Sequence, residues 1–142
     1  MNGHFDSIES AVETTVLELV HRNSLDEIED VLVQQGLLPD FASKSVLLIP
    51  SAFAAAQFEP TGIEFPSQFL VGPPGNERTL SYATEPVYVE ARRLAERWLK
   101  EGRLSLVKRV LDWSAEANCI KEANAKGLIP AKISMVHHGE IW

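Results

Sequence analysis

The chain has 142 residues, the size of one ordinary domain, and its 45% apolar and 23% charged composition excludes an intrinsically disordered protein. Its single cysteine excludes a disulfide-stapled secreted domain, and its beginning lacks the basic and apolar stretches of a signal peptide. The net charge is −7, and the longest uncharged run, Ser45–Phe58, is 14 residues, whereas a membrane span needs about 20.

The first two predicted helices follow each other closely near the start of the chain. Asp6, with Glu9 three residues later, predicts the start of a helix that runs to about Arg22. Ser24 and Glu27 repeat the pattern for a second helix, which Gly36 ends. Apolar residues at helical spacing give each helix one buried face, and the short connection predicts an antiparallel hairpin.

A third helix is predicted from Asp40 to about Phe58, with apolar residues on most of its faces. Pro50 lies inside this segment, so we expect a kink or two shorter helices there, and a strand over 45–49 is the alternative. The Pro- and Gly-rich segment 59–83 is either a functional loop or a β-hairpin that pairs Gln68–Val71 with Arg78–Tyr82.

The last predicted helices lie in the second half of the chain. Thr84 is expected to cap a helix that ends near Gly102, and a longer one is expected from about Leu104 to Ala125, followed by a short strand or a tail over 133–138. The sequence therefore predicts a mainly α fold, with about five helices in one bundle of antiparallel helix pairs, as a single domain over residues 1–142. Its expected location is the cytoplasm.

Ionised residues are distributed unevenly along the chain. Residues 1–77 have a net charge of −10, whereas residues 78–142 have a net charge of +3. An acidic surface attracts cationic partners and repels phosphates. We therefore expect a protein-binding module that neutralises a basic protein, as an immunity protein or antitoxin does, through the carboxylates of the first two helices. These residues are Glu9, Glu13, Asp26, Glu27, Glu29 and Asp30.

Two other functions remain open. The first is an enzyme or small-ligand binder whose site lies at the 59–83 segment, with Tyr82 and Arg78 lining a pocket. The second is nucleic-acid binding through a basic corner over residues 92–109, which the acidic charge of the whole chain disfavours. The basic corner consists of Arg92, Arg93, Arg97, Lys100, Arg103, Lys108 and Arg109.

Several weaker patterns lead to no site prediction. His137, His138 and Glu140 match no zinc spacing, even with Cys119 or His4 added, so no metal or other cofactor is expected. Ser105 and Lys108 fit Ser-x-x-Lys, but the companion motifs are missing and Ser105 suits a helix start. The Gly72–Glu77 segment is interpreted as a turn, and Cys119 as a small core residue. No catalytic residues are assigned.

Overall fold

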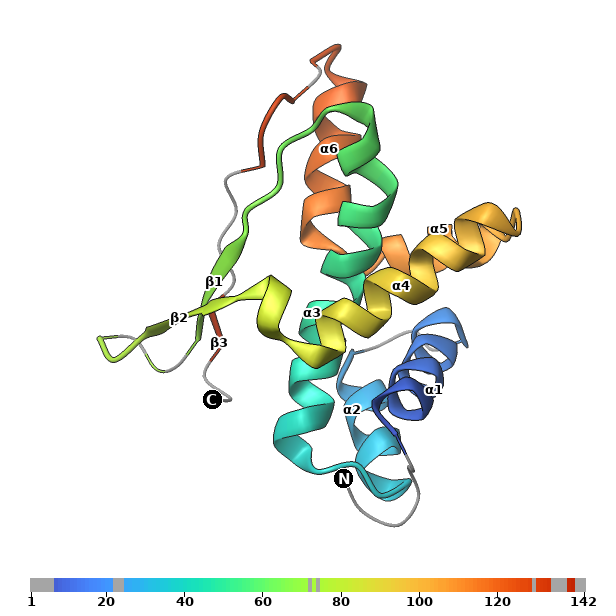
Figure 1. The fold of residues 1–142 in the computed structure, drawn as a ribbon, viewed down its shortest axis with the longest axis vertical. Coiled ribbons are helices and arrows are strands. Elements are labelled where there is room, and N and C mark those ends of the chain that lie inside the picture. Colours follow the sequence, from blue (N-terminus) through green and yellow to red (C-terminus); the bar gives the residue numbers. More distant parts are fainter. Residues whose placement is uncertain are drawn as a thin grey trace.

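A computed structural model describes residues 7–21, 25–71, 73, 75–128, 130–133 and 138–139. For Leu25, Asp26, Phe69, Val71 and His138 it describes the backbone alone. Most of these residues are helical, which confirms the mainly α prediction. The described helices are α1 (Ile8–His21), α2 (Leu25–Gln34), α3 (Pro39–Phe58), α4 (Pro86–Lys100), α5 (Leu104–Leu111) and α6 (Ala115–Ala125) (Figure 1).

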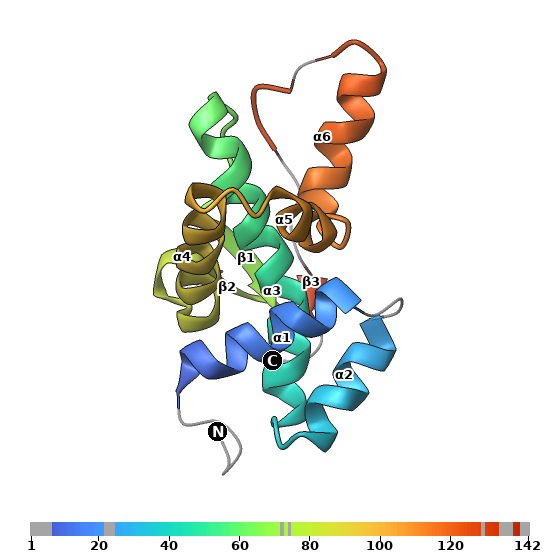
Figure 2. The ribbon, with the colours of Figure 1, turned by 90° about the vertical axis from the view of Figure 1, so that its right-hand side faces the viewer.

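Helix α3 is the centre of the fold. It runs along the length of the molecule and packs against α1, α2, α4, α5 and α6 (Figures 1 and 2). The sequence Ser51–Ala56 is buried without interruption, which agrees with its apolar residues on every face. By length and composition alone, Pro39–Thr61 could cross a membrane, but 67% of its most apolar window is buried inside the fold. Such burial is typical of a core helix.

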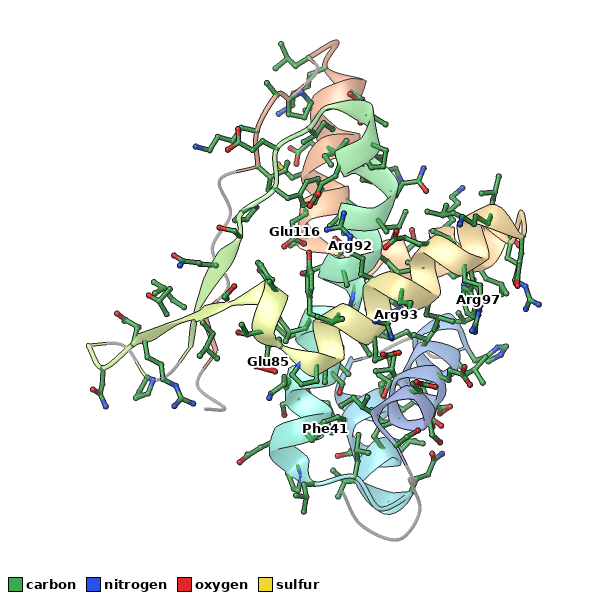
Figure 3. The ribbon with its side chains drawn as sticks, viewed as in Figure 1. Phe41, Glu85, Arg92, Arg93, Arg97 and Glu116 are labelled. Carbon is green, nitrogen blue, oxygen red and sulfur yellow. The ribbon has the colours of Figure 1, made fainter. Side chains whose placement is uncertain are left out.

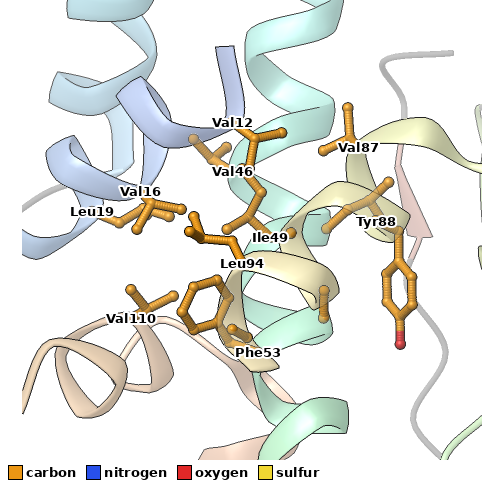
Figure 4. Close-up of a cluster of buried hydrophobic side chains, with 14 of the residues drawn as sticks. Val12, Val16, Leu19, Val46, Ile49, Phe53, Val87, Tyr88, Leu94 and Val110 are labelled. Carbon is orange, nitrogen blue, oxygen red and sulfur yellow. The ribbon is translucent and has the colours of Figure 1, made fainter. Parts of the chain in front are cut away.

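The main hydrophobic core lies between α3 and the helices that cover it. Figure 4 shows Val12 and Val16 of α1, Ile49 and Phe53 of α3 and Leu94 of α4 meeting in one cluster. The rings of Phe53 and Trp98 pack edge to face with centroids 5.9 Å apart. The apolar positions expected on α1 and α4 from their helical spacing are therefore the buried ones.

Several predicted helix boundaries differ from the structure. The expected long helix over 104–125 is two helices, because Ser114 begins α6 by accepting a hydrogen bond from the Ala117 amide at 3.0 Å. Helix α3 continues through Pro50, so a division into two helices is wrong, as is the alternative strand over 45–49. Thr84 bonds the Ser81 carbonyl and caps no helix.

The caps of the first two helices agree only in part with the prediction. Ser7 caps α1, since its hydroxyl accepts from the Ser10 amide at 3.2 Å, whereas Asp6 and Ser24 lie outside the described residues. Gly36 follows α2 with a φ of 110°, which favours glycine, and the Leu37 amide closes the turn by donating to the Leu32 carbonyl.

A small sheet stands to one side of the helices. Strand β1 (Gln68–Val71) pairs antiparallel with β2 (Arg78–Ser81), in the two segments considered for a hairpin, and parallel with β3 (His138–Gly139). The strand order is β2-β1-β3. Between β1 and β2 the Asn76 amide donates to the Pro73 carbonyl and the Glu77 carboxylate accepts from the Gly75 amide, whereas Gly72 of the predicted turn lies outside the described residues. Short 3₁₀ turns, η1 (Glu59–Thr61) and η2 (Tyr82–Thr84), join this region to α3 and α4.

Candidate functional site

A groove of about 1050 Å³ lies between the helices and the segment that leads to the sheet. Its walls are η1 and the following residues 62–67 on one side, η2 at one end, and the outer face of α4 on the other. The lining residues are Glu59, Gly62, Ile63, Glu64, Phe65, Pro66, Ser67, Ser81, Tyr82, Ala83, Tyr88, Val89, Arg92, Arg93, Glu96, Arg97 and Lys100.

Two tyrosines make the floor of the groove. The rings of Tyr82 and Tyr88 are stacked with centroids 4.4 Å apart and planes 30° apart. Tyr82 is placed by η2, and Tyr88 lies in the first turn of α4, which Pro86 begins. Only 5% of Tyr82 and 7% of Tyr88 is exposed, so each contributes an edge to the groove. Ile63 and Phe65 extend this apolar surface.

An arginine–carboxylate pair closes the floor on the α4 side. Arg92 donates through its two terminal nitrogens to both carboxylate oxygens of Glu59, at 3.2 and 3.0 Å. The Arg92 Nε atom also lies 3.8 Å from Glu96. Both partners of the Arg92–Glu59 pair remain about one third exposed, because they line the groove. This bidentate geometry is the strongest that an arginine makes with a carboxylate.

A buried carboxylate lies in the core behind the floor. Glu116 of α6 is 2% exposed and accepts hydrogen bonds from Ser51 at 3.1 and 3.2 Å and from Ser114 at 3.1 Å. Both serines are themselves buried. A buried carboxylate needs such donors to offset its lost hydration. The three residues join α3 to the start of α6 beneath the groove.

The protonation of the floor tyrosines follows from these surroundings. Burial raises the pKa of Tyr88 to about 12, against the opposing influence of the Arg92 guanidinium. Burial, followed by the negative charge of Glu116, raises the pKa of Tyr82 further. Both hydroxyls therefore stay protonated at neutral pH. Perturbed groups that cluster at a cleft are typical of functional sites.

The rim of the groove is formed by charged side chains that succeed one another along α4 (Figure 3). Arg93 pairs with Glu90 at 2.7 Å, and Arg97 lies 3.5 Å from Glu13 of α1. Lys100 is exposed at the end of the helix. The groove thus combines an apolar floor with a rim of basic and acidic side chains.

Comparison of the chain with protein-family models, with curated proteins and with solved structures found no match.

The six acidic residues predicted to bind a partner divide into two groups. Glu9 and Glu13 lie on α1 beside Arg93 and Arg97, with which they line a shallow hollow, so their charge is partly balanced within the molecule. On α2, Glu27 and Asp30 are exposed and Glu29 is half-buried, while only the backbone of Asp26 is described. The carboxylates of α1 thus have basic neighbours from α4 within the molecule.

The predicted ligand site agrees in part with the groove. Tyr82 lines it, as expected, whereas Arg78 is exposed on β2 and does not. Glu59, Tyr88 and Glu116 were missed. Tyr88 and Glu116 fall within helices that are recognised by the spacing of their apolar residues. A single tyrosine or glutamate in such a helix gives no signal of its own. Glu59 is the first residue of the 59–83 segment, so its place in the segment considered for a ligand site could have identified it.

The basic corner is mostly engaged inside the molecule. Arg92, Arg93 and Arg97 pair with carboxylates as above, and Arg103 pairs with Glu101 at 2.7 Å. Arg109 instead donates to the Val20 carbonyl of α1 at 2.8 and 3.2 Å. These pairings reduce the charge that is open to a phosphate backbone, so the corner gives nucleic-acid binding no structural support.

The weaker patterns are placed as follows. His4, His137 and Glu140 lie outside the described residues, and within the described part no three His, Cys, Asp or Glu side chains gather as metal ligands. Ser105 is the second residue of α5. Cys119 is exposed, so its interpretation as a core residue is wrong. It lies on the outer face of α6, whereas its neighbour Ile120 is buried.

Proposed function

We propose that this protein binds a small organic ligand in the groove between residues 62–67, η2 and α4. The proposal depends on one observation, the convergence of Tyr82, Tyr88 and the Arg92–Glu59 pair on one open hollow. Ligand pockets typically enclose roughly 300–1,000 Å³ and combine an apolar lining with a few fixed polar groups. The groove has about this volume and this composition.

The chemistry of the lining indicates a flat, partly apolar ligand. Tyr82, Tyr88 and Phe65 offer ring edges, against which planar groups pack well. The Arg92 guanidinium, which is about one third exposed, offers a hydrogen-bond donor next to this surface. A ring that carries one polar substituent would use both.

Filling the groove tests the proposal. Ala83 is exposed and lines the groove, so Ala83→Trp should occupy space without disturbing the core. Indole, benzamide and benzoate should shift the amide resonances of residues 62–67 and of α4 in the unmodified protein. In Ala83→Trp the apparent affinity for each compound, obtained from these shifts, should be at least about tenfold lower. This factor corresponds to about 1.4 kcal/mol.

The matched control is Ala125→Trp, which adds the same side chain at an exposed position of α6 outside the groove. It should bind the three compounds like the unmodified protein. Absence of groove shifts with every compound, or equal binding by both tryptophan variants, would rule out the proposed site.

A second proposal is that α2 docks on a basic protein, as in immunity proteins and antitoxins. What favours it is that the sequence of α2 contains four acids and no base, and that Glu27 and Asp30 are exposed. Glu9 and Glu13 are not part of this surface, because α1 presents them to the arginines of α4. Complementary charge speeds the encounter of two proteins and selects the partner.

Charge reversal separates this second proposal from the first. Asp26, Glu27, Glu29 and Asp30 replaced by lysine should weaken capture of a basic partner and remove the salt dependence of its association rate. Binding of indole in the groove should not change. A control with Glu122→Lys, an exposed position of α6, should capture the partner normally. Capture that survives the fourfold reversal would eliminate α2 as the docking surface.

A further inference from the structure

The Arg92–Glu59 pair has the geometry of a carboxylate bound to a receptor. Both Glu59 oxygens accept from separate nitrogens of one guanidinium, at 3.2 and 3.0 Å. A planar guanidinium recognises carboxylates in this bidentate manner, and lysine does not. The Arg92 guanidinium thus lines an open groove, and it already binds a carboxylate of the chain itself, that of Glu59.

Both partners of the pair are accessible from the groove. Arg92 and Glu59 are 34% and 35% exposed, so neither is locked in the core. Because the pair is bidentate and partly buried, a ligand must bring contacts of its own to displace Glu59. Glu59 lies where α3 ends and η1 begins, and its own amide donates to the Ala55 carbonyl of α3. A carboxylate that also gained contacts with the tyrosine floor could therefore displace it.

The groove lining carries charges of both signs around Arg92. Arg93, Arg97 and Lys100 line the same groove beyond Arg92, whereas the other carboxylates of the lining are Glu64 and Glu96. Once Glu59 is displaced from the guanidinium, the arriving anion replaces it there. Tyr88 lies against Arg92 and remains a neutral donor, since burial holds its hydroxyl protonated.

We propose that Glu59 occupies on Arg92 the position that the carboxylate of a small ring-bearing ligand takes when it binds. This inference rests on the proposed ligand-binding function and deepens it, because it names the chemical class of the ligand. The ring would pack against the floor, and the carboxylate would bind Arg92 in place of Glu59. Glu59 thereby acts as a competitor built into the chain.

Replacing Glu59 should strengthen the binding of benzoate, whereas replacing Arg92 should weaken it. Glu59→Gln should bind benzoate about two- to fivefold more tightly, the factor that corresponds to an exposed ion pair. Arg92→Gln should bind benzoate at least about tenfold more weakly, as expected for lost hydrogen bonds to a charged group. Arg92→Lys should recover part of that loss. The measurement is the dissociation constant from amide-shift titration at low salt.

Benzamide is the neutral probe of the same shape, and its affinity should change little in either variant. Glu101→Gln and Arg103→Gln are the matched controls, since this pair has the same chemistry outside the groove. Both should bind benzoate like the unmodified protein. Inorganic phosphate tests whether any anion suffices, and it should bind more weakly than benzoate because it cannot use the tyrosine floor.

The outcomes distinguish this inference from the function on which it rests. Tighter binding of benzoate to Glu59→Gln supports it, and misfolding cannot produce that sign. Equal affinity for benzoate and benzamide, an unchanged or weaker affinity in Glu59→Gln, or phosphate binding as tight as that of benzoate, would overturn the inference alone. Absence of binding by all three ring compounds would overturn the ligand-binding function as well.

Discussion

Tyr82 and Tyr88 are the two tyrosines of the chain, and both form the floor of the groove. Their pKa values are raised by burial, that of Tyr88 to about 12 and that of Tyr82 further, with Glu116 adding to the latter. The same burial that keeps the hydroxyls protonated makes them sensitive reporters of the intact site. Any tyrosinate signal from this protein reports on these two residues.

We predict that ionisation of the tyrosines accompanies unfolding in alkali. In the unfolded chain a tyrosine has a pKa of about 10, so between pH 10 and 12 the folded state holds a proton that the unfolded chain has lost. The stability from these groups is present below pH 10 and is lost as the pH rises. Tyrosinate absorbance and circular dichroism should therefore change together above pH 10.

Tyr88→Phe should move that transition to higher pH, because it removes one of the two linked ionisations. The urea-unfolded chain serves as the reference and should titrate near pH 10. A tyrosinate signal that is complete near pH 10 while the circular dichroism stays native would contradict the burial of these hydroxyls.

Two side chains, one on α5 and one just beyond it, donate hydrogen bonds to the end of α1. Arg109 donates to the Val20 carbonyl, and Trp113, just beyond α5, donates to the Leu19 carbonyl at 2.7 Å. These carbonyls belong to the last turn of α1, where a helix leaves its acceptors without intrahelical donors. Side chains from an element far along the sequence thus cap the first helix.

Arg109→Met should lower the free energy of unfolding by about 1–2 kcal/mol, since hydrogen bonds from a charged donor are lost while the apolar stem is kept. Arg103→Met is the control, because Arg103 makes only an exposed ion pair with Glu101, and should change stability by less than about 0.5 kcal/mol. Urea unfolding measures both. An equal effect of the two variants would show that the cap contributes nothing.

Periodicity predicted the buried faces of the helices better than their ends. The stripe of Val12 and Val16, and that of Leu94 and Trp98, are buried as their spacing requires. The break between α5 and α6 was missed because the apolar stripe continues in phase across it, from Val110 to Ala117. The sign of the break was Ser114, a preferred N-cap residue, whose effect depends on local backbone geometry that periodicity does not reveal.

Across the whole molecule, ion pairs connect the acidic and basic halves of the sequence. Glu13–Arg97, Lys44–Glu85 and Glu59–Arg92 are ion pairs between residues 1–77 and residues 78–142. The counts of charge were correct from the sequence alone, but which charges meet depends on how α1 and α3 pack on α4. For the same reason, composition predicted an acidic surface on both early helices, while α1 presents Glu9 and Glu13 to arginines.

The groove could be predicted only in outline. A long Pro- and Gly-rich segment indicated that something other than packing determines residues 59–83, and Tyr82 was identified within it. The other lining groups come from α4, which long-range packing against α3 places beside this segment. No spacing in the sequence encodes the meeting of Ser51 with Glu116.

The outer wall of the groove is held from behind by the end of the chain. Glu64 bridges to Lys132 in parallel, its backbone exchanging hydrogen bonds with Ala131 and Ile133, and β3 pairs with β1 beyond it. Loss of the pairing between Glu64 and residues 131–133 would make the groove wall less rigid. A ligand bound in the groove would in turn stabilise that pairing. The paired residues 131–133 and 138–139 line no part of the groove, so under the proposed function a substitution there would alter ligand affinity only through the wall that they support.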